Sequence, residues 1–233
     1  MFNFVLASEQ FTLFWKTASI LPLHKKGSHY DETNYRPIAL LPSLSKVFEP
    51  IALLLYLKLV HKHLYSYLES NNFLTHRNSG FRKKHSTLTS LLKTTHDIYL
   101  AHDHKLSSRI VFLDISKAFD RIVHTSLLFK LKQLGIVGSL LNLITSYLEN
   151  RSQVVHSNGS TSEICYTNCG VPQGSVLGPL LFLIYVNDIS DNIQSSISLF
   201  ADDTTLYFSS KFPKHLHLVL SEDLLTLGKW SDT

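Results

Sequence analysis

The stretch RIVFLDISKAFD, residues 109–120, decides the fold, because an apolar run there ends abruptly at an acidic residue. The four residues from Ile110 to Leu113 are apolar without a break. Such a short run predicts a central strand that is buried on both faces. Asp114 follows at the end of this strand, where a carboxylate would stand at the edge of a sheet.

A second acidic site follows in SISLFADDTTLYFS, residues 196–209. Only Asp202 and Asp203 separate two β-rich runs, which predicts a two-residue hairpin with both carboxylates at its tip. Neighbouring strands of one sheet would bring these carboxylates next to Asp114. Clustered carboxylates repel one another, and a hard divalent cation, Mg²⁺ above all, is the usual counter-charge. Two such ions can assist the displacement of a phosphoryl group.

Each acidic motif also has an ordinary structural interpretation. An Asp after a strand is a common N-cap of a helix, and Asp-Asp is a common pair in hairpin turns. Either motif alone therefore favours a structural role. Their coincidence in one chain favours a shared metal site.

The other segments mix helical and extended patterns, which predicts an α+β fold with a mainly antiparallel sheet. Residues 151–169 are expected to form strands and turns, with a hairpin at Asn158-Gly159. Further segments are a short extended one at 34–42 and helices at 44–68 with Ser43 as cap, 86–100, 126–134, 140–148 and 180–186.

The composition is that of a folded protein. The chain has 233 residues, of which 44% are hydrophobic, so a sizeable core can be buried and disorder is not expected. Its two cysteines, Cys165 and Cys169, exclude a secreted disulfide scaffold and favour an intracellular location. A zinc site would need two more ligands, and His156 is the sole nearby candidate. No apolar run approaches the ~20 residues that span a bilayer, so no membrane partner is expected.

Charge is unevenly distributed along the chain. Residues 1–93 carry a net charge of +7, whereas residues 94–233 carry −3, within a total of +4. A basic N-terminal part favours an anionic partner, with nucleic acid or a polyphosphate first among the candidates.

Five segments resemble motifs of reverse transcriptases, in that family's order and at its usual spacing. Three are similar to successive palm motifs, namely FLDISKAFD at 112–120, GVPQGSVLGPLLF at 170–182 and FADDTTLY at 200–207. Two are similar to fingers motifs of the non-LTR (LINE-type) retrotransposon branch, namely NYRPIALLPSLSKVFE at 34–49 and SGFRKKHST at 79–87.

The resemblance implies the fingers and palm of a right-hand polymerase, with an antiparallel palm sheet packed on helices. The fingers would occupy residues 1–104, and the palm 105–233, with a return to the fingers around 125–165. It also implies a truncated fragment, incomplete in the palm at its C-terminus and without a thumb.

By resemblance, the chain is an RNA-directed DNA polymerase that adds deoxynucleotides to a primer 3′-hydroxyl by a two-metal-ion mechanism. Asp114 and Asp202 would be the main ligands of two Mg²⁺ ions, or of Mn²⁺ in their place, and Asp203 the third carboxylate. The implied partners are an RNA template, a DNA primer and deoxynucleoside triphosphates, in the nucleus or the cytoplasm. The sequence leaves the oligomeric state undetermined.

Other matching positions would contact the substrates. Phe119 stands where the family places an aromatic residue that blocks a ribose 2′-hydroxyl, although plain core packing also explains an aromatic here. Arg36 and Lys46 would grip the incoming triphosphate, and Gln173 and Gly174 belong to the loop beneath the template base and the nucleotide. As isolated residues, Arg36 and Lys46 would more often be solvated surface charges.

The basic run of Arg82, Lys83 and Lys84 would contact the template backbone in a salt-dependent manner that is blind to sequence. Asn78, just before this run, stands where the family usually has a glutamine. Two alternatives remain beside the reverse transcriptase. One is a palm polymerase that copies RNA into RNA, against which Phe119 argues. The other is a catalytically inert retrotransposon relic that only binds nucleic acid.

Overall fold

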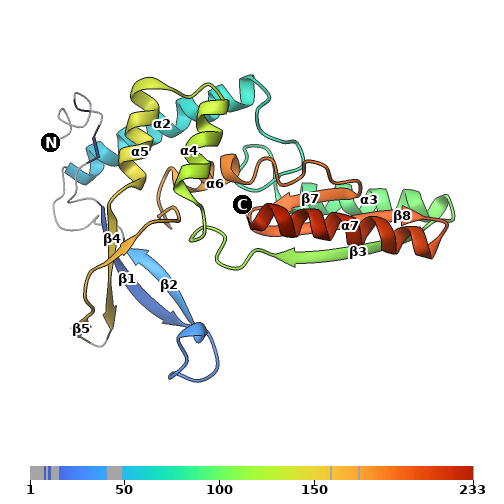
Figure 1. Cartoon of the computed structure of the whole chain (residues 1–233), viewed down its shortest axis with the longest axis horizontal. Coiled ribbons are helices and arrows are strands. Elements are labelled where there is room, and N and C mark those ends of the chain that lie inside the picture. The colour runs from blue at the N-terminus through green and yellow to red at the C-terminus, as the bar shows by residue number, and fades with distance from the viewer. Residues whose placement is uncertain are drawn as a thin grey trace. The chain divides into compact units, whose positions relative to one another are not determined.

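The computed structural model describes residues 8, 10–11, 16–40, 49–157, 159–172 and 174–232. The chain divides into two compact units, each built from two separate stretches of sequence (Figure 1). The first unit comprises the chain up to Ser70 together with Phe119–Ile184. The second comprises Asn71–Ala118 and the chain from Tyr185 onward.

The first unit contains a mixed sheet. Strand β1 pairs in parallel with β4 and antiparallel with β2, while β5 and β6 each pair antiparallel with β4. The predicted two-residue hairpin is confirmed, because Ser157 of β4 lies opposite Ser160 of β5. The strands are β1 (Thr17–His24), β2 (Tyr35–Leu40), β4 (Arg151–Ser157), β5 (Ser160–Thr161) and β6 (Cys165–Thr167).

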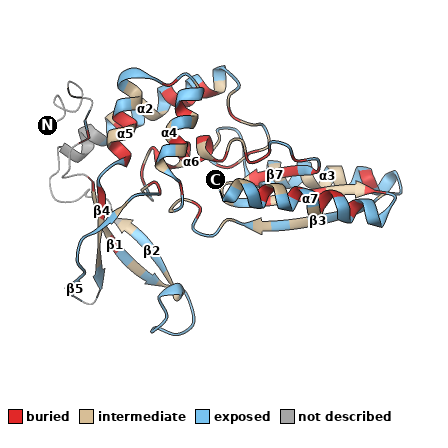
Figure 2. Cartoon of the chain, in the orientation of Figure 1, coloured by how far each residue is buried: buried red, intermediate tan, exposed pale blue. Residues whose placement is uncertain are grey.

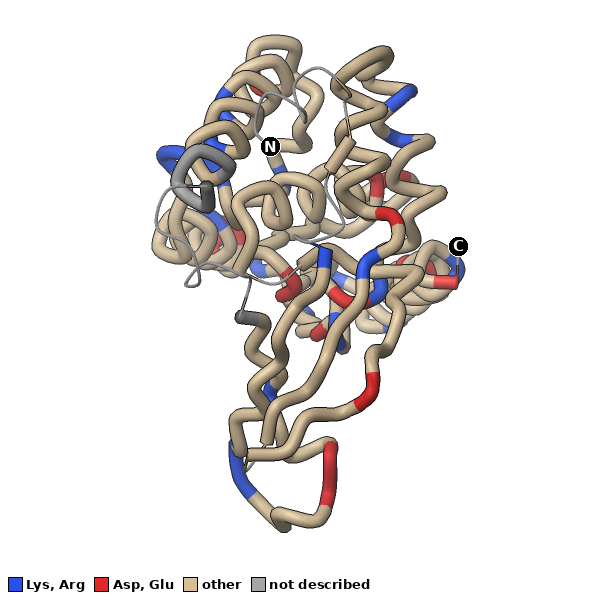
Figure 3. The backbone as a smooth tube through the Cα atoms, turned by 90° about the vertical axis from the view of Figure 1, so that its left-hand side faces the viewer, with Lys and Arg blue, Asp and Glu red and all other residues tan. Residues whose placement is uncertain are grey.

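The loop between β1 and β2 is the most polar part of this sheet. It carries Lys25 and Lys26 on one side and Asp31 and Glu32 on the other, so basic and acidic stretches alternate along it (Figure 3). Asp31 caps the short 3₁₀ helix η2 (Glu32–Asn34), because its carboxylate accepts a hydrogen bond of 2.9 Å from the Thr33 amide. The positive charge of the N-terminal part is therefore locally balanced here.

Helix α6 is the centre of the first unit. Leu180 to Ile184 are all at most 2% exposed, and a helix that is apolar all round belongs in a core (Figure 2). Pro179 lies in its first turn, as predicted. Among the described residues of this unit, three amphipathic helices accompany α6 and confirm the predicted helical segments, although the predicted Ser43 cap lies outside the described residues. They are α2 (Glu49–Ser70), α4 (His124–Gln133) and α5 (Gly138–Leu148), beside α6 (Gly178–Tyr185).

The second unit contains a three-stranded antiparallel sheet in the order β3-β8-β7, packed against helices α3 and α7 (Figure 1). Its strands are β3 (Ser107–Asp114), β7 (Ser196–Phe200) and β8 (Asp203–Ser210), and its helices are α3 (Thr87–Asp103) and α7 (Pro213–Ser231). The predicted start of α3 is confirmed: Ser86 and Thr89 form a reciprocal capping box.

The prediction that β3 is a central strand buried on both faces was wrong. Within the described residues, β3 is an edge strand, and the Phe112 side chain is 77% exposed. Val111 and Leu113 are half-buried, whereas Ile110 and Phe112 on the other face are exposed. A short run of apolar residues does not reveal how many neighbours the strand has, which is why the pattern misled.

The predicted hairpin is present, but its loop is displaced by one residue. Strand β7 ends at Phe200, β8 begins at Asp203, and the two-residue loop is Ala201-Asp202 rather than Asp202-Asp203. In this register the buried Leu199 lies opposite the buried Thr204, and the buried Ile197 lies opposite the buried Leu206.

Tyr207 ties β8 to α3 and provides a test of the second unit by pH. Its side chain is 4% exposed, and its hydroxyl donates a hydrogen bond of 2.6 Å to the Asp97 carboxylate. Burial and this hydrogen bond raise the pKa of Tyr207 to about 12. The fold therefore favours the protonated phenol. Its contribution to stability is complete below about pH 10, the ordinary tyrosine pKa, and declines as the pH rises toward 12.

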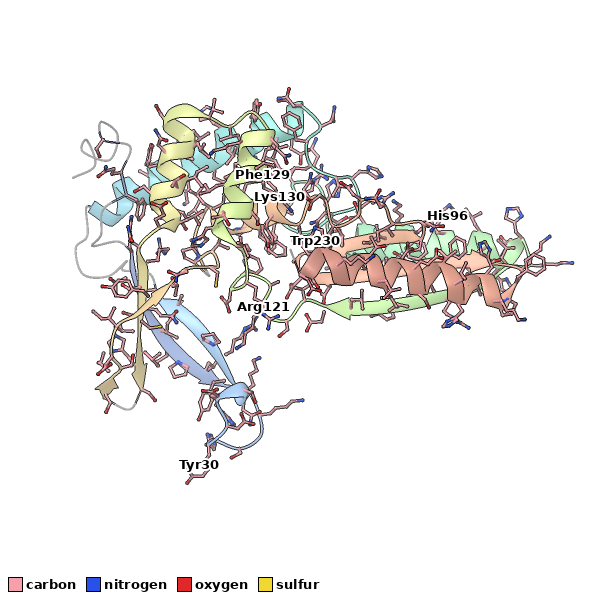
Figure 4. The ribbon with its side chains drawn as sticks, viewed as in Figure 1. Tyr30, His96, Arg121, Phe129, Lys130 and Trp230 are labelled. Atoms are coloured by element: carbon pink, nitrogen blue, oxygen red, sulfur yellow. The ribbon has the colours of Figure 1, made fainter. Side chains whose placement is uncertain are left out.

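We expect Tyr207→Phe to lower the free energy of unfolding by about 2 kcal/mol at pH 8, since a hydrogen bond to a charged group is lost. The variant should also lose less stability than the wild type between pH 10 and pH 12. Urea unfolding at several pH values measures both effects. Tyr30→Phe is the matched control, because Tyr30 is fully exposed at the tip of the β1–β2 loop (Figure 4). Equal alkaline losses in wild type and Tyr207→Phe would contradict the assignment.

Candidate active site

Asp114 and Asp203 lie directly opposite each other in the sheet of the second unit. Asp114 is the last residue of β3, Asp203 is the first of β8, and the two form the final pair of the antiparallel ladder. Opposed residues of such a ladder have Cα atoms at most about 5.5 Å apart and side chains on the same face. Both residues are exposed. Two segments far apart in sequence thus place two carboxylates side by side.

Asp202 completes the group from the turn between β7 and β8. It is half-buried and precedes Asp203 directly, so its Cα lies within about 9 Å of the Asp114 Cα, given a 3.8 Å step between neighbouring Cα atoms. The three acidic residues that the sequence singled out therefore meet at one end of this sheet. Among the described residues, none forms an ion pair or side-chain hydrogen bond with any of these three carboxylates.

The donor set suits a hard divalent cation, because carboxylate oxygens are the ligands that Mg²⁺ prefers. The side chains do not yet converge on one point: among the residues that the structure describes, no three His, Cys, Asp or Glu side chains lie close enough together to hold a metal ion. The backbone therefore assembles the three residues, while the side chains are not gathered as ligands.

Phe119 belongs to the first unit, where it is half-buried and stacks on Phe182 of α6. The ring centroids are 4.5 Å apart, and the ring planes are inclined by 17°. The Phe119 carbonyl also accepts a hydrogen bond of 2.9 Å from the Val171 amide. Stacking on Phe182 thus holds the ring, and the hydrogen bond from Val171 holds the Phe119 backbone. A fixed ring suits both a selective gate and a core residue.

The loop that begins at Gly170 packs directly on the segment after Phe119. Its Gly170 amide donates to the Ile122 carbonyl at 2.8 Å, and a side chain at Gly170 would come within 2.9 Å of the Asp120 backbone. Gly174 is exposed, with a φ of +75° that favours glycine. Gln173, predicted to contact the nucleotide, lies outside the described residues.

Of the two residues predicted to bind the triphosphate, the structure describes one. Arg36 is exposed on β2, opposite Leu23 of β1, in the first unit. Lys46 lies outside the described residues. The structure thus positions Arg36, Phe119 and Gly174 within the first unit, and the three carboxylates within the second.

Within the basic run at 82–84, the arginine has a structural role and the two lysines are exposed. Arg82 is half-buried, and its guanidinium donates to the carbonyls of Thr75 at 2.7 Å and of Asn78 at 3.4 Å, so it holds the loop before α3. Lys83 and Lys84 are exposed on the same loop. The two lysines are therefore better placed than Arg82 to meet a phosphate backbone.

Comparison with known proteins shows which family the chain belongs to. Residues 23–231 match the family model described as reverse transcriptase (RNA-dependent DNA polymerase). The chain belongs to the reverse transcriptase family. This match covers all five motifs and most of both units, and it confirms the resemblance that the motifs carried.

Relatives of the chain come from transposable elements, which confirms the predicted kinship with the LINE-type branch. The chain is 34% identical over 239 residues to the probable RNA-directed DNA polymerase from transposon BS of Drosophila melanogaster, covering 99% of this chain and 25% of that protein. It is 35% identical over 241 residues to the RNA-directed DNA polymerase from mobile element jockey of the same organism, covering 100% and 25%. The chain thus spans about a quarter of these relatives.

Solved structures support the α+β polymerase fold. The chain aligns with telomerase from Candida tropicalis in complex with a fragment of telomeric RNA, with a TM-score of 0.66 at 13% identity, over 98% of this chain and 42% of that one. Apo telomerase from the same organism, truncated from its C-terminal domain, gives a TM-score of 0.64 at 13% identity, over 98% and 51%. Among the helices that the structure describes, none is long and apolar enough to cross a bilayer.

Sequence reasoning missed two residues beside the family motifs. A ring nitrogen of His124 lies 2.7 Å from the Gly170 carbonyl oxygen, which fixes the start of the motif GVPQGSVLGPLLF at 170–182. Asn78 is 2% exposed and organises the loop before α3. The only signal for Asn78 was its departure from the family pattern, and His124 had none, because it contacts a residue 46 positions away.

Proposed function

We propose that this chain is the part of an RNA-directed DNA polymerase that adds deoxynucleotides to a primer 3′-hydroxyl. The observation that carries the proposal is the pairing of Asp114 with Asp203 at the end of the second unit's sheet, next to the turn that holds Asp202. Membership of the reverse transcriptase family supports the same proposal. The division into fingers at 1–104 and palm at 105–233 is proposed with it.

In this proposal, Asp114 and Asp202 hold two divalent cations, Mg²⁺ or alternatively Mn²⁺, and Asp203 provides the third carboxylate. Bound cations would supply electrostatic stabilisation to an in-line displacement at the α-phosphorus and to the pyrophosphate that leaves. The carboxylates suit this role because they are exposed or half-buried at a strand end, without protein partners among the described residues. The carboxylates would hold and orient the cations, and they would form no covalent bond with the substrate.

Residues of the first unit would position the nucleotide. Phe119 would exclude a ribose 2′-hydroxyl, since its ring is fixed by stacking on Phe182. Arg36 and Lys46 would bind the triphosphate, and Arg36 suits bidentate contacts with phosphate oxygens. Gln173 and Gly174 would lie beneath the template base and the incoming nucleotide.

The proposed partners are an RNA template, a DNA primer and deoxynucleoside triphosphates. Lys83 and Lys84 would contact the template backbone, while Arg82 orders their loop. We infer an intracellular location, in the nucleus or the cytoplasm, where nucleic acid is available. The two exposed thiols, Cys165 and Cys169, suit a reducing compartment.

Primer extension tests the proposal directly. We expect the purified chain to extend a DNA primer on an RNA template with deoxynucleotides and Mg²⁺, and chelation of the metal to stop the reaction. Ribonucleotides should extend the same primer poorly. Binding of the template that falls steeply with salt but is accompanied by no extension would instead support the inert, nucleic-acid-binding relic. Efficient ribonucleotide addition would support an RNA-copying polymerase.

A further inference from the structure

A short segment before α3, Arg77–Gly80, attaches to the strand that leads into the acidic turn. The Ser79 amide donates to the Leu199 carbonyl at 2.9 Å, and the Leu199 amide donates to the Arg77 carbonyl at 2.9 Å. The two hydrogen bonds form a parallel bridge between Asn78 and Leu199. This segment, here called the support segment, thus extends the sheet β3-β8-β7 beyond β7, entirely within the second unit.

Asn78 bends the support segment toward the turn. Its side chain is 2% exposed, and its Oδ1 accepts a hydrogen bond of 2.9 Å from the Gly80 amide. Such a side-chain acceptor two residues before the donor closes a tight turn. The bend brings Gly80 onto the loop between β7 and β8.

Gly80 touches the acidic turn with its backbone. A Cβ atom at this position would lie 2.2 Å from the Ala201 nitrogen, 2.9 Å from the Ala201 Cα and 3.1 Å from the Phe200 carbonyl carbon. All three are backbone atoms, which cannot swing aside as the end of a flexible side chain can. Gly80 does not have a positive φ, so the close approach, and not its own conformation, requires glycine here.

The residue that Gly80 supports has an unusual backbone. Ala201 has a φ of +56°, in the left-handed region that L-residues other than glycine and asparagine seldom adopt. Such a conformation persists where surrounding structure holds it. Contact with Gly80 supplies that support immediately before Asp202.

We propose that the support segment is a positioning element, in which the Gly80 backbone braces the Ala201-Asp202 turn and so sets the position of Asp202 relative to Asp114. The inference rests on the proposed polymerase function, and assigns to that site a residue that touches neither substrate nor metal. The contact between Gly80 and the turn matters for catalysis because Mg²⁺ demands near-ideal octahedral geometry. A displaced Asp202 carboxylate could not provide a ligand in that geometry.

The experiment compares Gly80→Ala with Gly228→Ala. Gly228 lies in α7 of the same unit, has no positive φ, and a Cβ there would meet nothing within 4 Å. Binding of Mn²⁺, followed by electron paramagnetic resonance, reports on the carboxylates without requiring polymerisation. We expect Gly80→Ala to weaken Mn²⁺ binding about tenfold and Gly228→Ala to leave it unchanged.

Kinetics separates positioning from substrate binding. In primer extension, Gly80→Ala should lower kcat with Mg²⁺ about a hundredfold and leave the KM for deoxynucleotide within about twofold of the wild type. The reason is that Gly80 would set the position of the Asp202 carboxylate and would not contact the nucleotide. Replacing Mg²⁺ by Mn²⁺ should recover part of the loss. A merely structural role would lower the melting temperature without this metal dependence.

Asn78→Ala serves if Gly80→Ala does not fold, because it removes the acceptor for the Gly80 amide without introducing a clash. It should weaken Mn²⁺ binding in the same direction, by about threefold. Folded variants at positions 78 and 80 that bind Mn²⁺ as the wild type does would overturn the inference. A wild-type chain that neither binds Mn²⁺ nor extends a primer would instead overturn the proposed function.

Discussion

Asp114→Asn is expected to abolish primer extension, lowering kcat at least about a thousandfold while the chain stays folded. The substitution keeps the shape of the side chain but removes one of two opposed carboxylates at the end of the β3–β8 ladder. Metal ions contribute several kcal/mol of charge stabilisation to phosphoryl displacement, and about 4 kcal/mol corresponds to three orders of magnitude in rate. Single-turnover extension with saturating nucleotide measures the loss.

The matched control is Asp103→Asn, which makes the same change of charge in the same unit. Asp103 is exposed in the last turn of α3. Its replacement should leave the rate of primer extension within about twofold of the wild type. Substitution of an exposed surface residue outside the acidic group has little effect on the fold. If Asp114→Asn and Asp103→Asn extend primers equally well, the acidic group of the second unit is not the site of chemistry.

Asp203 and Asp202 are distinguished by where the hairpin turns. The sequence placed both at the tip, but the structure places Asp202 in the loop and Asp203 in the ladder opposite Asp114. An acidic pair is compatible with either register, because both residues suit turns. Burial does not decide between them, because moving the loop by one residue shifts each cross-strand partner by two positions and keeps the same faces together. Only the strand pairing in the structure, with Phe200 opposite Asp203, places the turn.

Elements with strong local signals were predictable from the sequence. Ser86, a residue type preferred at N-caps, marks the start of α3, and the continuous apolar run of α6 marks a buried helix. The position of β3 in its sheet was not predictable, because an apolar run has the same appearance in a central strand and in an edge strand whose outer face carries Phe112.

The residues that support the candidate site escaped prediction for a different reason. Gly80 contacts Ala201, and Gly170 contacts Asp120, through backbone atoms of segments far apart in the sequence. No periodicity or spacing encodes such contacts. The glycine residues within the family motifs were visible, but what each glycine faces depends on the tertiary structure.

Phe119→Val should make the enzyme accept ribonucleotides. If the aromatic ring blocks a 2′-hydroxyl, its removal opens space for that group while leaving deoxynucleotides almost unaffected. We expect the ratio of kcat/KM for deoxynucleotide over ribonucleotide to fall about a hundredfold, or about 2.7 kcal/mol of discrimination. Single-nucleotide addition with each substrate on the same primer and RNA template gives both values.

Stability and selectivity distinguish the gate from core packing, because Phe119 stacks on Phe182 and its truncation costs packing under either interpretation. A core residue would lower the melting temperature and reduce the use of both nucleotides alike, which leaves the ratio unchanged. Phe129→Val is the matched control: Phe129 lies on α4 of the same unit and is 60% exposed (Figure 4). Only a gate moves the ratio at Phe119 while the same substitution at Phe129 does not, since excluding a hydroxyl requires the ring to contact the nucleotide.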